Sequence, residues 1–159
     1  MLSNIQLPAT ALRVERHTEP ELNEAIGAVT DARLAELERA DATRIARRLA
    51  YLEREWDIER TSQLNAAVIA GTGLLLGAKV DRRFLALPLA VFSFFLQHAI
   101  QGWCPPIPVF RQLGVRTARE IARERYALNA LRGDFDAWLP AGQVQGAVRV
   151  EAALRAVDA

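Results

Sequence analysis

Between Thr61 and Pro108 the chain reads TSQLNAAVIAGTGLLLGAKVDRRFLALPLAVFSFFLQHAIQGWCPPIP, and this stretch decides the fold. It contains two apolar runs, Thr61 to Ala78 and Phe84 to Ile100, and neither run holds an Asp, Glu, Lys or Arg. A short polar turn, Lys79 to Arg83, separates them. At about 1.5 Å of rise per residue, the first run makes a helix of roughly 27 Å, near the thickness of bilayer hydrocarbon. We therefore predict a transmembrane hairpin of two antiparallel helices over residues 61–108.

The composition of the whole chain is consistent with a membrane protein and argues against several other classes. The mean hydropathy of +0.03 averages an apolar hairpin with charged flanks. The net charge is +1, and Arg alternates with Asp and Glu on the same segments, so we expect no nucleic-acid partner. A single cysteine, Cys104, excludes an internal disulfide. No phosphate loop, Ser-His-Asp set or metal cluster is evident, so we expect no cofactor and lean against an enzyme.

The segments before the hairpin divide into two parts. Residues 1–17 show no sustained period and are expected to form a loose N-terminal arm. Residues 18–60 are expected to form an amphipathic helical arm that begins with a capping box, Thr18 to Glu21, and is interrupted at Gly27 or at Asp41. No basic region followed by an apolar run opens the chain, so the hairpin itself is expected to direct insertion.

After the hairpin, residues 109–140 are expected to form a cytoplasmic helix followed by an aromatic docking segment. The helix is predicted from a second capping box, Thr117 to Glu120, and from Gly133 as its C-terminal cap. Phe135, Trp138 and Leu139 would dock on the membrane or on the arm, and residues 141–159 form a weakly structured tail. We expect four arginines to face an anionic lipid leaflet: Arg116, Arg119, Arg123 and Arg125.

Each apolar run carries a distinct face. In the first run, small residues recur every three or four positions, at Ala66, Ala70, Gly73 and Gly77. Such a face allows close helix contact, either with the second helix of the same chain or with a second copy.

The second run carries a polar face formed by Ser93, Gln97 and Gln101, with His98 beside it. An unpaired amide in hydrocarbon is costly, so this face is expected to form hydrogen bonds with a partner helix. An alternative role for His98 is that of a metal or haem ligand, or of a proton carrier.

The distribution of basic residues sets the expected orientation. Arginines are more numerous on the two flanks of the hairpin than in its turn, which places both termini in the cytoplasm by the positive-inside rule. Three basic residues in the turn, Lys79, Arg82 and Arg83, argue for the inverse orientation.

The second run ends in Gly102-Trp103-Cys104-Pro105, followed by Leu113-Gly114-Val115 and Thr117. These residues, with Asp57-Ile58-Glu59-Arg60 before the hairpin, resemble the YgaP-like transmembrane domain family, small bacterial inner-membrane proteins of unassigned function. The resemblance covers about Trp56 to Thr117 and implies a two-helix hairpin in the bacterial inner membrane. Domains of that family are sometimes joined to rhodanese-type sulfurtransferase domains, but this chain has no segment of that size.

The sequence thus predicts an all-α membrane protein whose hairpin is flanked by cytoplasmic amphipathic helices. Its expected role is structural, scaffolding or partner-binding, with three kinds of partner: the lipid bilayer, a second copy through the hairpin or the N-terminal arm, and another protein. The alternative is a thiol redox or sulfur-relay component that uses Cys104, although the C-terminal end of a helix does not favour the thiolate. A further alternative is a soluble helical bundle with a buried hairpin.

Overall fold

The computed structural model describes residues 9–135, and every regular element within that range is helical, as the all-α prediction requires. Predictions for residues 1–8, for Trp138 and Leu139, and for residues 141–159 lie outside the described residues. The chain divides into two compact units. The hairpin unit comprises the described residues 9–23 and 56–117, and the bundle unit comprises residues 24–55 and 118–135.

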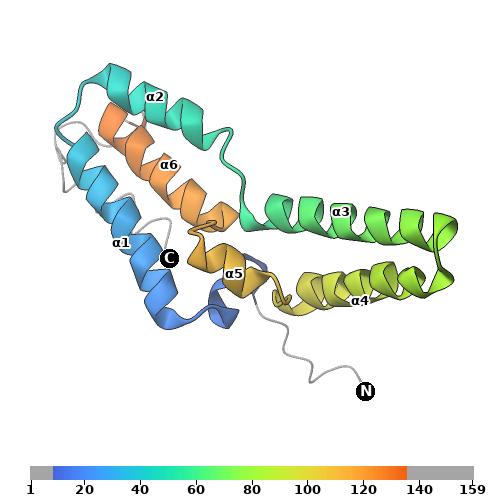
Figure 1. Cartoon of the computed structure of the whole chain (residues 1–159). Helices are drawn as coiled ribbons and strands as arrows, with labels where there is room; N and C mark the ends of the chain where they lie inside the picture. Colours follow the sequence, from blue (N-terminus) through green and yellow to red (C-terminus); the bar gives the residue numbers. More distant parts are fainter. Residues whose placement is uncertain (1–8, 136–159) are drawn as a thin grey trace. The chain divides into compact units, whose positions relative to one another are not determined.

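The hairpin unit is built around two long antiparallel helices, α3 (Ile58–Lys79) and α4 (Ala86–Gln101), which lie side by side (Figure 1). The Asp57 side chain caps α3 by accepting a hydrogen bond from the Arg60 N–H at 2.8 Å. A short 3-10 helix, η3 (Arg82–Leu85), leads from the polar turn into α4. Gly102, in the left-handed region at φ +83°, ends α4 where the Gly-Pro-rich sequence predicts.

Shorter elements complete this unit at its base, the end of the hairpin away from the turn. The six-residue α5 (Ile107–Gln112) follows the proline-rich loop. Two 3-10 helices, η1 (Thr10–Leu12) and η2 (Glu15–His17), lie in the segment expected to be a loose arm. Val14, between them, is buried in a small cluster with Ile58, Cys104 and Ile107. We call residues 9–18 the N-terminal strap.

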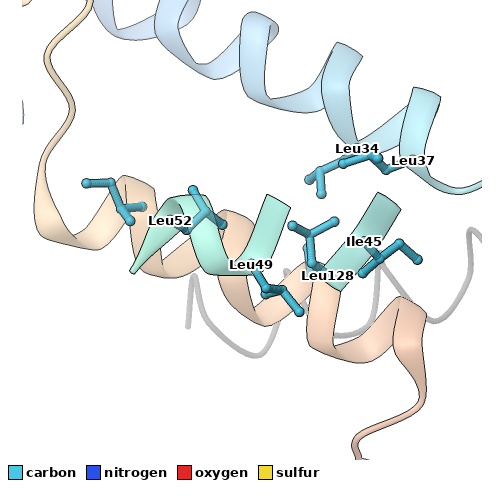
Figure 2. Packing of buried hydrophobic residues seen from close by; sticks show 8 residues of the cluster. Leu34, Leu37, Ile45, Leu49, Leu52 and Leu128 are labelled. Atoms are coloured by element: carbon cyan, nitrogen blue, oxygen red, sulfur yellow. The ribbon is translucent and has the colours of Figure 1, made fainter. Parts of the chain in front are cut away.

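The bundle unit contains α1 (Pro20–Leu37, from Glu24 onward), α2 (Ala42–Leu52) and α6 (Ala118–Arg132). Asp41 caps α2 by accepting a hydrogen bond from the Arg44 N–H, so the predicted break falls at Asp41 while α1 continues through Gly27. The three helices enclose an apolar core (Figure 2) made of Leu34, Leu37, Ile45, Leu49, Leu52, Ile121, Ala127 and Leu128.

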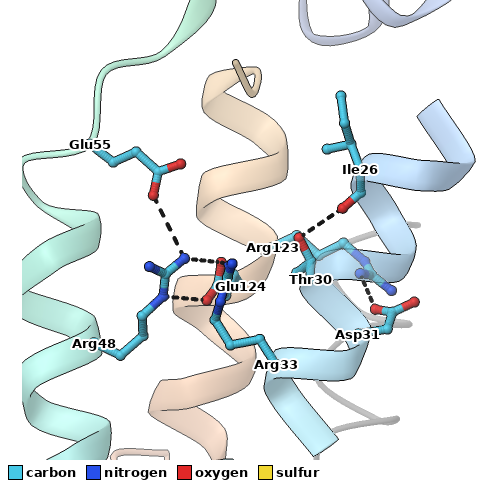
Figure 3. A network of polar contacts seen from close by, with 8 residues as sticks. All are labelled: Ile26, Thr30, Asp31, Arg33, Arg48, Glu55, Arg123 and Glu124. Carbon is cyan, nitrogen blue, oxygen red and sulfur yellow. Dashed lines mark hydrogen bonds and ion pairs between the residues drawn. The ribbon is translucent and has the colours of Figure 1, made fainter. Parts of the chain in front are cut away.

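A buried carboxylate lies inside the bundle unit. Glu124 of α6 is 0% exposed, and Arg48 of α2 donates to its two oxygens at 2.7 and 2.9 Å (Figure 3). Arg33 of α1 adds a longer contact of 3.4 Å to the same carboxylate. Because a buried charge is tolerated only when it is paired, Glu124 ties the three helices to one register.

The two predicted capping boxes have different outcomes. The Thr18 hydroxyl donates to the carbonyl of Val14 at 2.9 Å within the strap, and α1 begins at Pro20. The helix predicted after Thr117 is present as α6, and Gly133 ends it at φ +90° as predicted. The Thr117 hydroxyl itself donates to a carboxylate oxygen of Glu15 at 3.0 Å.

Candidate functional site

The small face of α3 packs against η3 and α4 of the same chain. Ala70, Gly73 and Gly77 are buried, and Ala66 is partly buried. A Cβ atom added to Gly73 would lie 2.6 Å from Pro88 Cδ, and one added to Gly77 would lie 2.5 Å from Leu85 Cδ2. Of the two roles that the sequence leaves open for this face, the structure therefore shows contact within the chain.

The outer faces of the same two helices are apolar and exposed. Leu75 of α3 is 66% exposed and Leu89 of α4 is 69% exposed. Other exposed members of this surface are Leu64, Val68, Leu74, Leu87, Phe92, Phe94, Leu96 and Ile100. Small residues thus line the inside of the hairpin while its large apolar side chains point away from it.

Only one segment of residues 9–135, Arg82–Gln101, is long and apolar enough to count as a candidate membrane span, and 11% of it is buried. The helix α3 is comparable in length, but Ser62, Gln63 and Asn65 in its first turns lower its hydropathy. The described residues thus contain two long antiparallel helices but one candidate span, and the prediction that both helices cross a membrane is not confirmed.

A polar cluster joins the two helices at the hairpin base. The ring nitrogen Nε2 of His98, in the last turn of α4, lies 2.8 Å from Oε2 of Glu59 in the first turn of α3. Arg13 of the strap donates to the other oxygen of Glu59. His98 is 2% exposed, and its ring stacks on Phe95. The cluster therefore connects three segments that are far apart in the sequence.

The polar cluster changes the pKa of Glu59, a residue that precedes the apolar run beginning at Thr61. The hydrogen bond from His98 lowers the pKa of Glu59, and the charges of His98 and Arg13 act in the same direction against the opposing effect of burial. Glu59 thus stays ionised where it is half-buried. Among residues 9–135 no group of three or more His, Cys, Asp or Glu side chains is arranged to hold a metal ion.

The strap packs directly on the loop that ends α4. A Cβ atom added to Gly102 would lie 2.5 Å from the carbonyl carbon of Arg13, so this position admits only glycine on both steric and conformational grounds. Nδ1 of His17 lies 2.8 Å from the Arg13 carbonyl oxygen, and a guanidinium nitrogen of Arg13 donates to the Thr10 carbonyl at 3.0 Å. These contacts hold the strap in its own folded shape while it covers the base.

The predicted motif Gly102-Trp103-Cys104-Pro105 lies in this loop. Gly102 and Cys104 are buried, Trp103 is partly exposed and Pro105 is exposed. Burial raises the pKa of the Cys104 thiol, so the thiolate that sulfur transfer requires is disfavoured. Cys104 packs with Val14, Ile58 and Ile107, which is the environment of a structural thiol.

The polar face of α4 is placed differently from His98. Ser93 and Gln101 are exposed and Gln97 is partly exposed, so this face does not lie in the α3–α4 interface. The Ser93 hydroxyl donates to the carbonyl of Leu89 at 2.9 Å within its own helix. Gln97 makes a long contact of 3.5 Å to Gln101. Among the described residues 9–135, the three residues of this face make no hydrogen bond to another helix, whereas His98 beside it contacts Glu59 of α3.

The four arginines expected to face a lipid leaflet are engaged elsewhere. Arg116 is buried, and Arg119 is partly buried. Arg123 binds Asp31 at 2.8 Å, and Arg125 donates to the Leu52 carbonyl at 3.5 Å. The sequence could not show this, because an arginine on an amphipathic helix has the same local pattern whether it faces lipid or a neighbouring helix.

Arg111 and Arg13 are site residues that the sequence did not identify. Arg111 is 1% exposed and donates to the Val115 carbonyl at 3.0 Å and to the Asn23 side chain at 2.7 Å. It therefore ties α5 to the start of α1. The one available signal was an arginine inside the apolar segment from Ile107 to Val115.

Comparison with known proteins gives no relative from which a function could be taken: no protein-family model, no curated protein and no solved structure matches this chain.

Proposed function

We propose that this chain is an integral membrane protein whose α3–α4 hairpin is embedded in a bilayer and whose helical bundle unit serves a structural or partner-binding role. The observation that carries the proposal is the inverted packing of the hairpin, with glycines inside and exposed Leu and Phe outside. In water such a surface would be a large exposed apolar patch, whereas lipid covers it without cost.

The two ends of the hairpin support the same proposal. The turn carries the charged side chains of Lys79, Asp81, Arg82 and Arg83. The base carries Trp103 and Trp56, and the Arg60 guanidinium lies 4.2 Å from the centre of the Trp56 ring. An apolar band between a charged turn and a Trp-Arg base is typical of helices whose two ends lie in opposite membrane interfaces.

The lengths are also suitable. At about 1.5 Å per residue, the uncharged part of α3, Thr61 to Ala78, extends roughly 27 Å, near the thickness of bilayer hydrocarbon. The proposed arrangement is multi-pass, with both termini on the cytoplasmic side of a bacterial inner membrane. It agrees with the hairpin that the resemblance to the YgaP-like transmembrane domain family implies.

Carbonate extraction and liposome flotation of the full chain test membrane insertion, and Phe92→Asp, near the middle of the candidate span and 59% exposed, sharpens the test. A carboxylate near the middle of a span costs about 3 kcal/mol, so Phe92→Asp should move most of the protein out of the floating fraction. The matched control is Val29→Asp, at a position of α1 that is 57% exposed. If both variants leave the wild-type distribution unchanged, or if the wild-type chain is released by carbonate, the proposal is wrong.

Single cysteines distinguish a spanning hairpin from one that enters a single leaflet. In a Cys104→Ser chain, Asp81→Cys places a thiol in the turn and Gln112→Cys places one at the base. A membrane-impermeant maleimide should label these two thiols from opposite sides of sealed vesicles. Labelling of both from the same side would exclude the spanning arrangement, and exchange of the two sides would reverse the proposed orientation.

A further inference from the structure

The turn of the hairpin gathers three basic side chains that have no partner among the described residues. Lys79, Arg82 and Arg83 are exposed, and none of them makes an ion pair or a side-chain hydrogen bond within residues 9–135. Asp81 is the single acidic residue between positions 61 and 110, and its carboxylate accepts a hydrogen bond from the Arg83 backbone N–H at 2.8 Å. The turn therefore carries an excess of positive charge.

The backbone of the turn is closed on itself, so these cations are held on a fixed frame. The N–H groups of Val80 and Asp81 both donate to the carbonyl of Leu76, at 2.8 and 3.1 Å. The Phe84 N–H donates to the carbonyl of Asp81 at 3.1 Å. Because this backbone is already ordered, binding of a ligand by its side chains costs little further entropy.

The surroundings of the turn are apolar and supply no anion. Val80 is 69% exposed and Phe84 is 40% exposed, and the helices on both sides expose Leu and Phe side chains. Along α3 the next carboxylate after that of Asp81 is Glu59, in the first turn of the helix, roughly 30 Å away at about 1.5 Å of rise per residue. The anion that neutralises the turn therefore comes from outside the hairpin.

We propose that the turn binds the head groups of anionic phospholipids in the leaflet that it reaches. The inference rests on the proposed membrane insertion of the hairpin, which places Lys79, Arg82 and Arg83 beside lipid phosphates. A zwitterionic head group carries its own cation next to the phosphate, whereas an anionic phospholipid has a net negative charge that complements the turn. Arginine binds phosphate oxygens in pairs, and lysine adds a point charge. Lipid binding also gives a role to three basic residues that the positive-inside rule does not explain on this side of the membrane.

Quenching of a fluorophore in the turn tests this lipid preference. The full chain with Cys104→Ser and Val80→Cys is labelled and reconstituted in phosphatidylcholine vesicles. A small share of the lipid carries a spin label on its acyl chain, with either a phosphatidylglycerol or a phosphatidylcholine head group. The phosphatidylglycerol form should quench the label in the turn more strongly, and equal quenching by the two forms overturns the proposal.

Two changes in the turn should shift the preference for phosphatidylglycerol in opposite directions. Lys79→Gln, Arg82→Gln and Arg83→Gln together should lower it at least about fivefold, because a single basic residue near a membrane surface contributes about that factor. Asp81→Asn removes the opposing charge but keeps an oxygen for the Arg83 N–H, so it should raise the preference. A triple variant that keeps the preference overturns the proposal, as does an Asp81→Asn chain that loses it.

Matched controls distinguish a local site from the general charge of the chain. Arg39→Gln, Arg47→Gln and Arg54→Gln together remove three exposed arginines of the bundle unit and should leave quenching at Val80→Cys unchanged. A label at Leu113→Cys, a position near the hairpin base that is 75% exposed, should not respond to the changes in the turn. Equal losses of preference in the bundle variant and the turn variant would overturn the proposal.

Flotation separates this proposal from the membrane assignment. Vesicles of phosphatidylcholine alone should float the wild-type chain, because insertion depends on the apolar surface of the hairpin rather than on head-group charge. A chain that floats without preferring phosphatidylglycerol keeps the membrane assignment and refutes the lipid site. A chain that does not float refutes the membrane assignment, and with it the lipid site.

Discussion

Nε2 of His98 lies 2.8 Å from Oε2 of Glu59, and this contact closes the hairpin at its base by joining the last turn of α4 to the first turn of α3. Arg13 binds the same carboxylate from the strap. Glu59 is therefore the point at which the two long helices and the N-terminal strap meet.

Stability should depend on pH through Glu59. Because the folded-state pKa of Glu59 is lowered, its stabilising contribution is present above the unfolded pKa of about 4.5 and is lost as the pH falls through the folded value. Thermal unfolding followed by circular dichroism in micelles should therefore show a component of destabilisation below about pH 4.5.

Glu59→Gln should remove that component and lower the stability at neutral pH. Glu38→Gln, at an exposed position, is the control for a general change in carboxylate number. If the stability of the Glu59→Gln chain depends on pH as that of the wild type does, then protonation of Glu59 is not the cause of the pH dependence.

Gly102→Ala should destabilise the hairpin base more than Gly114→Ala does. Both glycines have positive φ, at +83° and +79°, so each substitution carries the left-handed penalty of about 1 kcal/mol. Only at Gly102 does the added Cβ meet the backbone of Arg13, whereas Gly114 has open space around it. The difference in unfolding temperature between the two variants measures the contact with the strap, and equal effects would argue against it.

Gly73→Ala should weaken α3–α4 packing, while Gly71→Ala should not. The added methyl at Gly73 would lie 2.6 Å from Pro88 Cδ, and overpacking of this kind costs about 1–3 kcal/mol. Gly71 has nothing within 4 Å, so the better helix propensity of alanine should make Gly71→Ala neutral or stabilising. Denaturant unfolding in micelles compares the two, and the reverse order would contradict the packing described.

Arg48→Met should destabilise the bundle unit strongly. It removes two hydrogen bonds to Glu124, which is 0% exposed, and breaking a buried ion pair costs about 3–5 kcal/mol. Asp31→Asn breaks the exposed pair with Arg123 and should cost less than about 1 kcal/mol. Near-ultraviolet circular dichroism during heating reports both, and a mild effect of Arg48→Met would contradict the importance of the Arg48–Glu124 pair.

Cys104 should react slowly with iodoacetamide in the native chain and rapidly after unfolding. Its burial both blocks access and raises the pKa of its thiol. The control is Leu113→Cys with Cys104→Ser, because Leu113 is 75% exposed. Fast labelling of native Cys104 would instead revive the sulfur-relay alternative.

The helices of the hairpin could be predicted because their signals are local. Three signals in the sequence each involve only neighbouring residues: the uncharged runs, the polar turn from Lys79 to Arg83, and Gly102 followed by three prolines. The spacing of Gly73 and Gly77 likewise placed a small face on α3, although the sequence did not state what would cover it.

The base of the hairpin could not be predicted because its contacts are between distant residues. Three segments must pack together before Arg13, Glu59 and His98 come into contact. The sequence around each of these residues does not indicate which residue it contacts. The strap was missed for a related reason: its 3-10 turns are too short to produce an apolar period around Val14. Threonine often caps a helix, but the Thr18 hydroxyl instead donates a hydrogen bond to the carbonyl of Val14.

The packing of the strap on Gly102 also fixes an order of events during synthesis. Val14 leaves the ribosome 88 residues before Gly102 does, a delay of roughly 4–18 s at ordinary rates of translation. Through that interval the strap lacks the Gly102 loop on which it packs, and Glu59, once made, can meet Arg13 but not yet His98. The strap can therefore reach its folded position only after α4 and the loop that ends it have been made, so the base of the hairpin is covered after the hairpin itself is complete.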